Sequence, residues 1–142
     1  MIALDTNILV YAHRSKCHEY KKARKTIENA AKNPQGCGIP LPVITEFWSV
    51  VTHPLSTGRP SMPKEAWEFL EYLHNHIGFK IWNPQDGFFT RVAQLAVDLK
   101  ISGLRIFDLQ IALVAFENGA RELWTQDRSF IHLPGLRCFH PF

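Results

Sequence analysis

The first ten residues, MIALDTNILV at positions 1–10, place an acid directly behind a short apolar run. Residues 2–4 have the composition of a short buried strand, and Asp5 ends it. Thr6 and Asn7 follow before apolar residues resume. An acid in this place has two interpretations: it caps a helix that follows the strand, or it is a carboxylate held at the strand end for chemistry. The rest of the sequence has to distinguish them.

Segments with strand-like and helix-like patterns alternate along the rest of the chain. We predict strands over 2–4, 79–82 and 122–125, with another near 138–140. We predict helices over 17–32, 42–51, 63–73, 86–99 and 107–120, and a turn over 33–38. The helix over 86–99 should bury Phe89, Val92, Ala93, Ala96 and Leu99. This alternation favours one α/β domain, residues 1–142, with a parallel sheet covered by helices on both sides.

Composition and charge exclude several classes of protein. The chain is 46% hydrophobic, which favours a folded globule, yet no apolar run approaches the ~20 residues of a membrane helix. The start of the chain does not resemble a secretory signal, so we expect a cytoplasmic protein with three reduced cysteines. Seven of the 16 Lys and Arg lie between Arg14 and Lys32. They form either a solvated helix face or a surface that attracts phosphate.

Four of the 13 acids occupy unusual positions, at strand ends or within apolar helices: Asp5, Glu46, Asp108 and Asp127. Each has a local explanation. Asp5 and Asp127 could cap helices, Asp108 could complement a helix dipole, and Glu46 could lie on a narrow exposed stripe. Together they suggest more, because ligands collect beyond the carboxyl ends of parallel strands. Four converging carboxylates repel one another unless cations join them, and hard ions such as Mg²⁺ or Mn²⁺ suit such a site.

Other kinds of site have less support. The histidines show no metalloprotease or zinc-finger spacing, and no Gly-x-Ser-x-Gly segment occurs. A phosphate-accepting signalling receiver also gathers acids at strand ends. It needs a second acid beside the first and a lysine after a late strand, which the segments LDTN and LWTQD do not supply.

Four segments resemble those of a PIN-domain ribonuclease of the VapC toxin type. They are ALDTNILVYA at 3–12, VITEFWSVVTHP at 43–54, RIFDLQIALVAFENGA at 105–120 and LWTQDRSF at 123–130, in the family's order. The resemblance implies a three-layer α/β/α fold with a central parallel sheet and an acidic pocket at its carboxyl edge. It also implies Mg²⁺- or Mn²⁺-dependent cleavage of RNA. For a toxin–antitoxin pair it implies a homodimer that a small antitoxin inhibits. The alternative is a catalytically silent PIN-fold module that binds RNA or protein.

The resemblance also assigns roles to residues of this chain. Asp5, Glu46, Asp108 and Asp127 match the family's four acids, and Asp5 and Asp108 would hold the metal most directly. Thr6, Asn7 and Thr125 would support them. Many relatives carry a further acid where this chain has Ser129, so the number of metal ions stays open. Arg14 and Arg105 are candidate RNA contacts, although Arg105 could equally form a surface ion pair.

Overall fold

A five-stranded, all-parallel sheet organises the protein, with the strand order β3-β2-β1-β4-β5. The computed structural model describes residues 1–56 and 58–142. The strands are β1 (Ile2–Leu4), β2 (Cys37–Pro40), β3 (Lys80–Trp82), β4 (Glu122–Trp124) and β5 (Arg137–Phe139). The α-helices are α1 (Thr6–His13), α2 (Tyr20–Ala31), α3 (Leu41–Thr52), α4 (Pro63–Glu71), α5 (Phe88–Asp98) and α6 (Arg105–Glu117), and α4 continues into a π-helix, η1 (Tyr72–Ile77).

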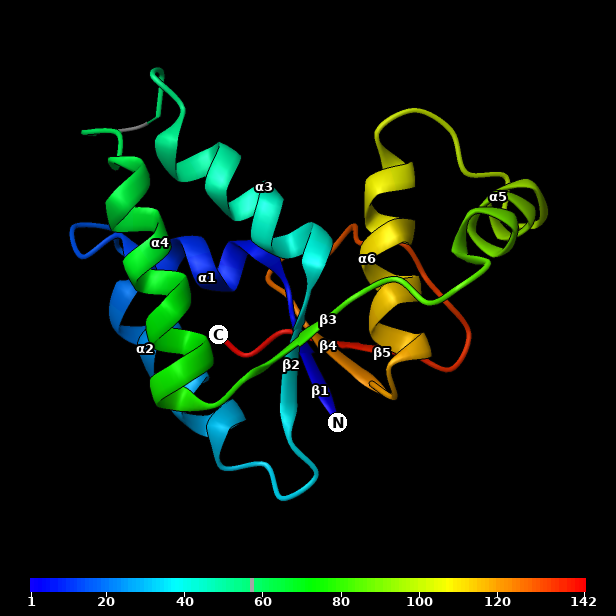
Figure 1. The fold of residues 1–142 in the computed structure, drawn as a ribbon, viewed down its shortest axis with the longest axis horizontal. Helices are drawn as coiled ribbons and strands as arrows, with labels where there is room; N and C mark the ends of the chain where they lie inside the picture. Colours follow the sequence, from blue (N-terminus) through cyan, green and yellow to red (C-terminus); the bar gives the residue numbers. More distant parts are fainter. Residues whose placement is uncertain (57) are drawn as a thin grey trace.

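The helices form two layers around the sheet. Helices α1, α2 and α4 lie on one side and α5 and α6 on the other, while α3 starts where β2 ends and contacts both α1 and α6 (Figure 1). The predicted three-layer α/β/α architecture with a parallel sheet is therefore confirmed. None of the described helices combines the length and the apolar character that a bilayer crossing demands.

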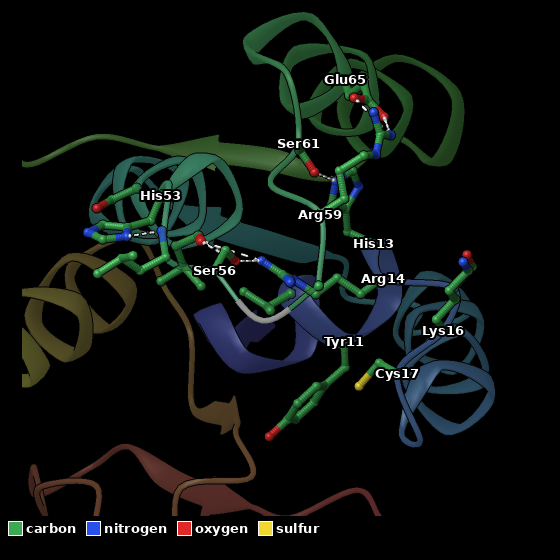
Figure 2. A pocket seen from close by; sticks show the side chains of 16 residues that line it. Tyr11, His13, Arg14, Lys16, Cys17, His53, Ser56, Arg59, Ser61 and Glu65 are labelled. Carbon is green, nitrogen blue, oxygen red and sulfur yellow. Dashed lines mark hydrogen bonds and ion pairs between the residues drawn. The ribbon is translucent and has the colours of Figure 1, made fainter.

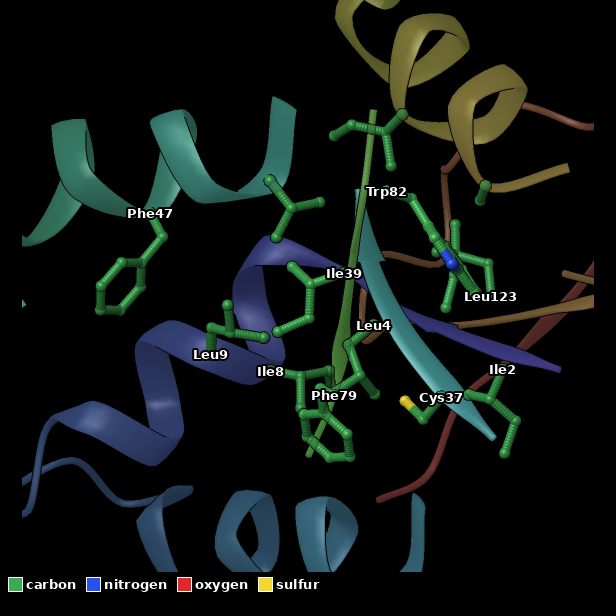
Figure 3. Close-up of a cluster of buried hydrophobic side chains, with 14 of the residues drawn as sticks. Ile2, Leu4, Ile8, Leu9, Cys37, Ile39, Phe47, Phe79, Trp82 and Leu123 are labelled. Atoms are coloured by element: carbon green, nitrogen blue, oxygen red, sulfur yellow. The ribbon is translucent and has the colours of Figure 1, made fainter. Parts of the chain in front are cut away.

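The core is built around β1 at the centre of the sheet. Ile2, Leu4 and the α1 residues Ile8 and Leu9 are buried together with Phe47 of α3 (Figure 3). Helix α6 matches its predicted character, because six residues on several of its faces are buried: Leu109, Ile111, Ala112, Leu113, Val114 and Ala115. Burial on this scale fixes β1 and α6 firmly, and both carry candidate site residues at their ends.

The predicted turn over 33–38 is wrong at its end, because β2 begins at Cys37. The strand contains Gly38 and Pro40, two residue types that are depleted in strands, so its pattern did not indicate one. The structure explains Gly38: a Cβ atom there would lie 2.3 Å from the Trp82 ring of the neighbouring β3. The glycine is required for close packing of a side chain over the sheet.

The predicted buried face of the helix over 86–99 is also partly wrong. Phe89 is 82% exposed and Ala93 is exposed, whereas Val92 packs against the core as expected. The helix begins at Phe88, after Gly87 in a left-handed conformation, and Phe88 rather than Phe89 faces inward. Two adjacent phenylalanines fit the apolar spacing about equally well, so the pattern alone could not choose between them.

Candidate active site

Strands β1 and β4 are neighbours and bring two polar segments to the same edge of the sheet. Leu4 pairs with Trp124, and the Asp5 backbone N–H donates to the Trp124 carbonyl oxygen at 3.0 Å. Asp5 and Thr125, the first residues beyond the two strands, therefore lie side by side. This is the carboxyl edge at which ligands bind in parallel sheets.

Asp5 is buried, with 5% of its surface exposed, and both carboxylate oxygens accept hydrogen bonds. Oδ1 accepts from the Thr6 backbone N–H at 2.8 Å. Oδ2 accepts from Thr125 Oγ1 at 2.6 Å and from Asn7 Nδ2 at 3.2 Å. The first bond makes Asp5 the N-cap of α1, so the capping interpretation of the opening segment is confirmed. The second oxygen faces a separate polar network.

Burial raises the pKa of Asp5 to about 6. The hydrogen bonds from Thr125 and Thr6 oppose this rise in pKa, and the negative charges of Glu46 and Asp108 add to it. The ionised form of Asp5 is therefore disfavoured in the folded protein, which is the expected condition of a carboxylate placed among other carboxylates.

The Thr125 hydroxyl connects two of the candidate acids. It is fully buried, donates to Asp5, and accepts from Asn7 Nδ2 at 3.1 Å and from the Asp127 backbone N–H at 3.0 Å. One donor and two acceptor positions satisfy a hydroxyl completely. Thr125 and Asn7 thus lie where support of Asp5 requires them. Thr6 contributes through its backbone N–H, because its buried Oγ1 has no hydrogen-bond partner within the described residues.

Asp127 is held by a turn and not by a helix. Its Oδ1 accepts from the backbone N–H of Ser129 at 2.9 Å and from Ser129 Oγ at 2.7 Å. Among residues 1–56 and 58–142 no helix follows Asp127, so its interpretation as a helix cap is wrong. Ser129, in the position where many relatives are expected to carry an acid, instead fixes the orientation of the Asp127 side chain.

Asp108 lies in the first turn of α6 and is half-buried. Burial raises the pKa of Asp108, and the charges of Asp127 and Glu46 add to the rise. The Ile131 backbone N–H and the Arg105 guanidinium lower the pKa of Asp108 and oppose that effect. Burial and the like charges thus outweigh the effects of Ile131 and Arg105, as expected for a carboxylate that lies near other carboxylates.

Glu46 differs from the other three acids because its side chain is exposed on α3, beside the exposed Thr45 and Ser49. The interpretation as a narrow exposed stripe is correct in this respect. Its charge nevertheless raises the pKa of both Asp5 and Asp108. Asp5, Glu46, Asp108 and Asp127 thus lie near enough for their charges to act on one another, and we refer to these four residues as the acidic cluster.

Comparison with known proteins identifies the family of the chain. The family model for the PIN domain matches residues 2–136 of this chain. The chain belongs to the PIN-domain family. It is similar to ribonuclease VapC43 of Mycobacterium tuberculosis, with 33% identity over 141 residues that cover 99% of this chain and 95% of the relative. It is also similar to ribonuclease VapC48 of the same organism, with 26% identity over 138 residues, 97% of this chain and 95% of the relative.

Solved structures show the same fold at lower sequence identity. VapBC2 from Rickettsia felis, bound to a promoter DNA fragment, has a TM-score of 0.69 and 24% identity over 98% of both chains. VapC20 of Mycobacterium tuberculosis, a toxin that cleaves the sarcin-ricin loop, has a TM-score of 0.68 and 12% identity over 92% of both chains. These likenesses extend across almost the whole PIN domain.

The cluster of this PIN domain offers only oxygen ligands, which suit a hard divalent cation. Within the described part of the chain, no three His, Cys, Asp or Glu side chains come close enough to hold one ion directly. Mg²⁺ usually keeps several of its water molecules and is held by one or two carboxylates together with substrate phosphates, so it does not require three protein ligands. The donor set thus fits the expected metal.

The two candidate RNA contacts lie in different places. Arg105 is exposed at the start of α6, three residues before Asp108. Arg14 lies at the far end of α1 from Asp5, roughly 13 Å away along the helix. It contacts Ser56 Oγ and donates to the Val50 carbonyl oxygen at 3.4 Å, so it braces the end of α3.

A cavity of about 990 Å³ lies beside Arg14, between the ends of α1 and α3 and the segment that precedes α4 (Figure 2). One of the cations that line this cavity already has an acidic partner, because Arg59 pairs with Glu65 at 3.1 Å.

Farther along the basic segment, Lys21, Lys22 and Lys25 are exposed on α2 opposite buried residues. Their arrangement is that of a solvated helix face.

Proposed function

We propose that this PIN domain is a divalent-metal-dependent endoribonuclease and the toxin of a toxin–antitoxin pair. The observation that carries the proposal is the acidic cluster, in which burial, with a smaller contribution from like charges, raises the pKa of Asp5 and Asp108. Such a cluster is arranged for a cation and not for stability of the metal-free fold. The names of the similar VapC proteins, which are ribonucleases, support RNA as the substrate.

The residues of the cluster would divide the work. Asp5 and Asp108 would hold Mg²⁺ or Mn²⁺, and Glu46 and Asp127 would orient its water molecules. When bound, the ion supplies an acidified water and neutralises charge on the scissile phosphate. Thr125 and Asn7 keep Asp5 in one orientation. Water adds to phosphorus and the 3′ oxygen leaves with a proton, which yields a 3′-hydroxyl and a 5′-phosphate.

The substrate would be single-stranded or looped RNA, because the scissile linkage must reach carboxylates at the edge of the sheet. Arg105, three residues before Asp108 on α6, would contact a flanking phosphate. Cleavage of cellular RNA would take place in the cytoplasm.

Cleavage of total cellular RNA tests the proposal. The purified chain, freed of any bound antitoxin, should cut RNA with Mn²⁺ or Mg²⁺, and cleavage should stop when the ion is chelated. The variant Asp86→Asn removes an exposed acid outside the cluster and should cut like the wild type. Sequencing the fragment ends would identify the target. Absence of cleavage with either ion would favour the silent binding module.

We expect two protein partners. A small antitoxin would present Arg or Lys to the acidic cluster, because the carboxylates attract a basic side chain.

A second copy of the chain would cover apolar side chains of α5 and the start of α6, where Phe89 and Leu104 are each 82% exposed. Co-expression with the neighbouring small gene, followed by sedimentation, should yield a complex with two toxin chains. A chain that purifies alone and sediments as a monomer at micromolar concentration would contradict both expectations.

A further inference from the structure

The loop that follows β4 is held from its outer side by residues 139–142, which the sequence did not single out. The Thr125 backbone N–H donates to the Phe139 carbonyl oxygen at 2.9 Å. His140 Nδ1 lies 2.6 Å from the Thr125 carbonyl oxygen. Because a carbonyl oxygen only accepts, Nδ1 carries the hydrogen and His140 is the donor. Thr125 is thus bound through its backbone on one side and through its hydroxyl on the other.

Gln126 makes a second attachment to the same segment. Its Nε2 donates to the main-chain oxygen of Phe142 at 2.8 Å, and its Oε1 accepts from the Phe142 backbone N–H at 3.1 Å. Two bonds from one planar amide fix its orientation. The Gln126 backbone N–H donates to Asn7 Oδ1 at 3.0 Å, and Asn7 in turn bonds Asp5. Gln126 therefore connects residues 140–142 to the acid at the end of β1.

The loop needs such attachments because of the charges that it carries. β4 ends at Trp124, and Asp127 follows in a turn without the hydrogen-bond ladder of a strand or a helix. Asp127 faces the like charge of Asp108, and the repulsion between them acts to push the loop away from the cluster. The bonds from His140 and Gln126 oppose this movement.

We propose that Gln126 and His140 are positioning residues, which keep Asp127 and the Thr125 hydroxyl beside Asp5 and Asp108 and so determine how tightly the cluster binds a divalent cation. This inference rests on the proposed function, since it concerns the same cluster. Outer partners of metal ligands commonly change metal affinity by about 10- to 100-fold when they are removed. Gln126 and His140 act through Thr125 and Asn7, and not by contact with the cation.

The experiment compares Mn²⁺ binding by calorimetry in the full chain and its variants. His140→Ala and Gln126→Met remove the bonds and should each weaken Mn²⁺ binding by up to about 10-fold, the lower end of the range for direct partners of metal ligands, because they act one step farther from the cation. His140→Asn should bind nearly like the wild type, because its amide nitrogen takes the place of Nδ1. Gln85→Met is the matched control: Gln85 donates to Asn118 Oδ1 at 3.2 Å, outside the cluster, and its loss should change nothing. In cleavage, kcat should fall more than KM rises.

Each outcome separates the two proposals. A wild type that binds no Mn²⁺ contradicts the proposed function and removes the basis of the inference. Equal Mn²⁺ affinity in the wild type, His140→Ala and Gln126→Met contradicts the inference but not the proposed function. Equal losses in His140→Asn and His140→Ala also contradict it, because the donor at Nδ1 then has no effect. If the variants are unfolded at the titration temperature, His140→Asn included, these contacts hold the fold and the inference is wrong.

Discussion

Asp108→Asn should lower the rate of RNA cleavage by at least about 100-fold, because even outer partners of a metal site contribute 10- to 100-fold. The same change should leave the metal-free protein as stable as the wild type or slightly more stable. The amide keeps the shape of the side chain but removes a negative charge that burial and Asp127 disfavour. Loss of activity with gain of stability is typical of residues that are placed for function.

Cleavage assays and thermal melts of the same two preparations check this prediction, with Asp86→Asn as a control for the loss of one acid. If Asp108 only complements the α6 dipole, Asp108→Asn should instead melt lower, by up to about 1 kcal/mol of stability, and should still cut RNA. That result would make Asp108 a structural residue.

Asp5→Asn should remove cleavage as well and should also change how metal-free stability depends on pH. The pKa of Asp5 is raised to about 6 in the folded protein, above the ordinary value of 3.8 that it takes when unfolded. A raised pKa means that the folded state gains stability from Asp5 below about pH 4 and loses it as the pH rises through 6. The loss amounts to about 2 kcal/mol between pH 4 and pH 7.

The asparagine does not titrate, so the variant should lack this loss. Urea denaturation of both proteins at pH 4 and at pH 7 gives their free energies of unfolding. The loss is the decrease in this free energy from pH 4 to pH 7, compared between the wild type and the variant. Between pH 4 and pH 7 the wild type should lose about 2 kcal/mol of unfolding free energy relative to the variant. Parallel pH profiles for the two proteins would show that Asp5 is not held in a disfavoured ionised form.

The sequence predicted the parts of the fold that depend on local pattern. Residues 2–4 and 122–125 were predictable as strands because apolar and β-branched or aromatic residues dominate them, and the acids behind them followed from the rule for parallel sheets. Helix α6 was predictable because few helices are apolar nearly all round. β2 was not, because Gly38 is explained by the Trp82 ring. Trp82 lies 44 residues later in the sequence and comes next to Gly38 only when β2 and β3 pair in the folded sheet.

The candidate site was predictable in its acids but not in the contacts that hold them. Asp5, Asp108 and Asp127 stand out because acids rarely follow buried strands or head apolar helices, whereas the exposure of Glu46 depends on how α3 is turned in the fold. The bonds of Gln126 and His140 join residues whose types and spacing form no pattern. The support expected of Thr6 comes from its backbone N–H and not from its side chain, which no sequence pattern distinguishes.

The melting temperature with and without Mn²⁺ tests the cation site most directly, because it requires no knowledge of the RNA target. At an ion concentration 100 times the dissociation constant, mass action stabilises the folded protein by about 2.7 kcal/mol. For a domain of this size that is a rise of several degrees. The wild type and Asp86→Asn should both show the rise, and Asp108→Asn should show much less. No rise in the wild type, or an equal rise in all three proteins, would contradict a divalent cation site at the acidic cluster.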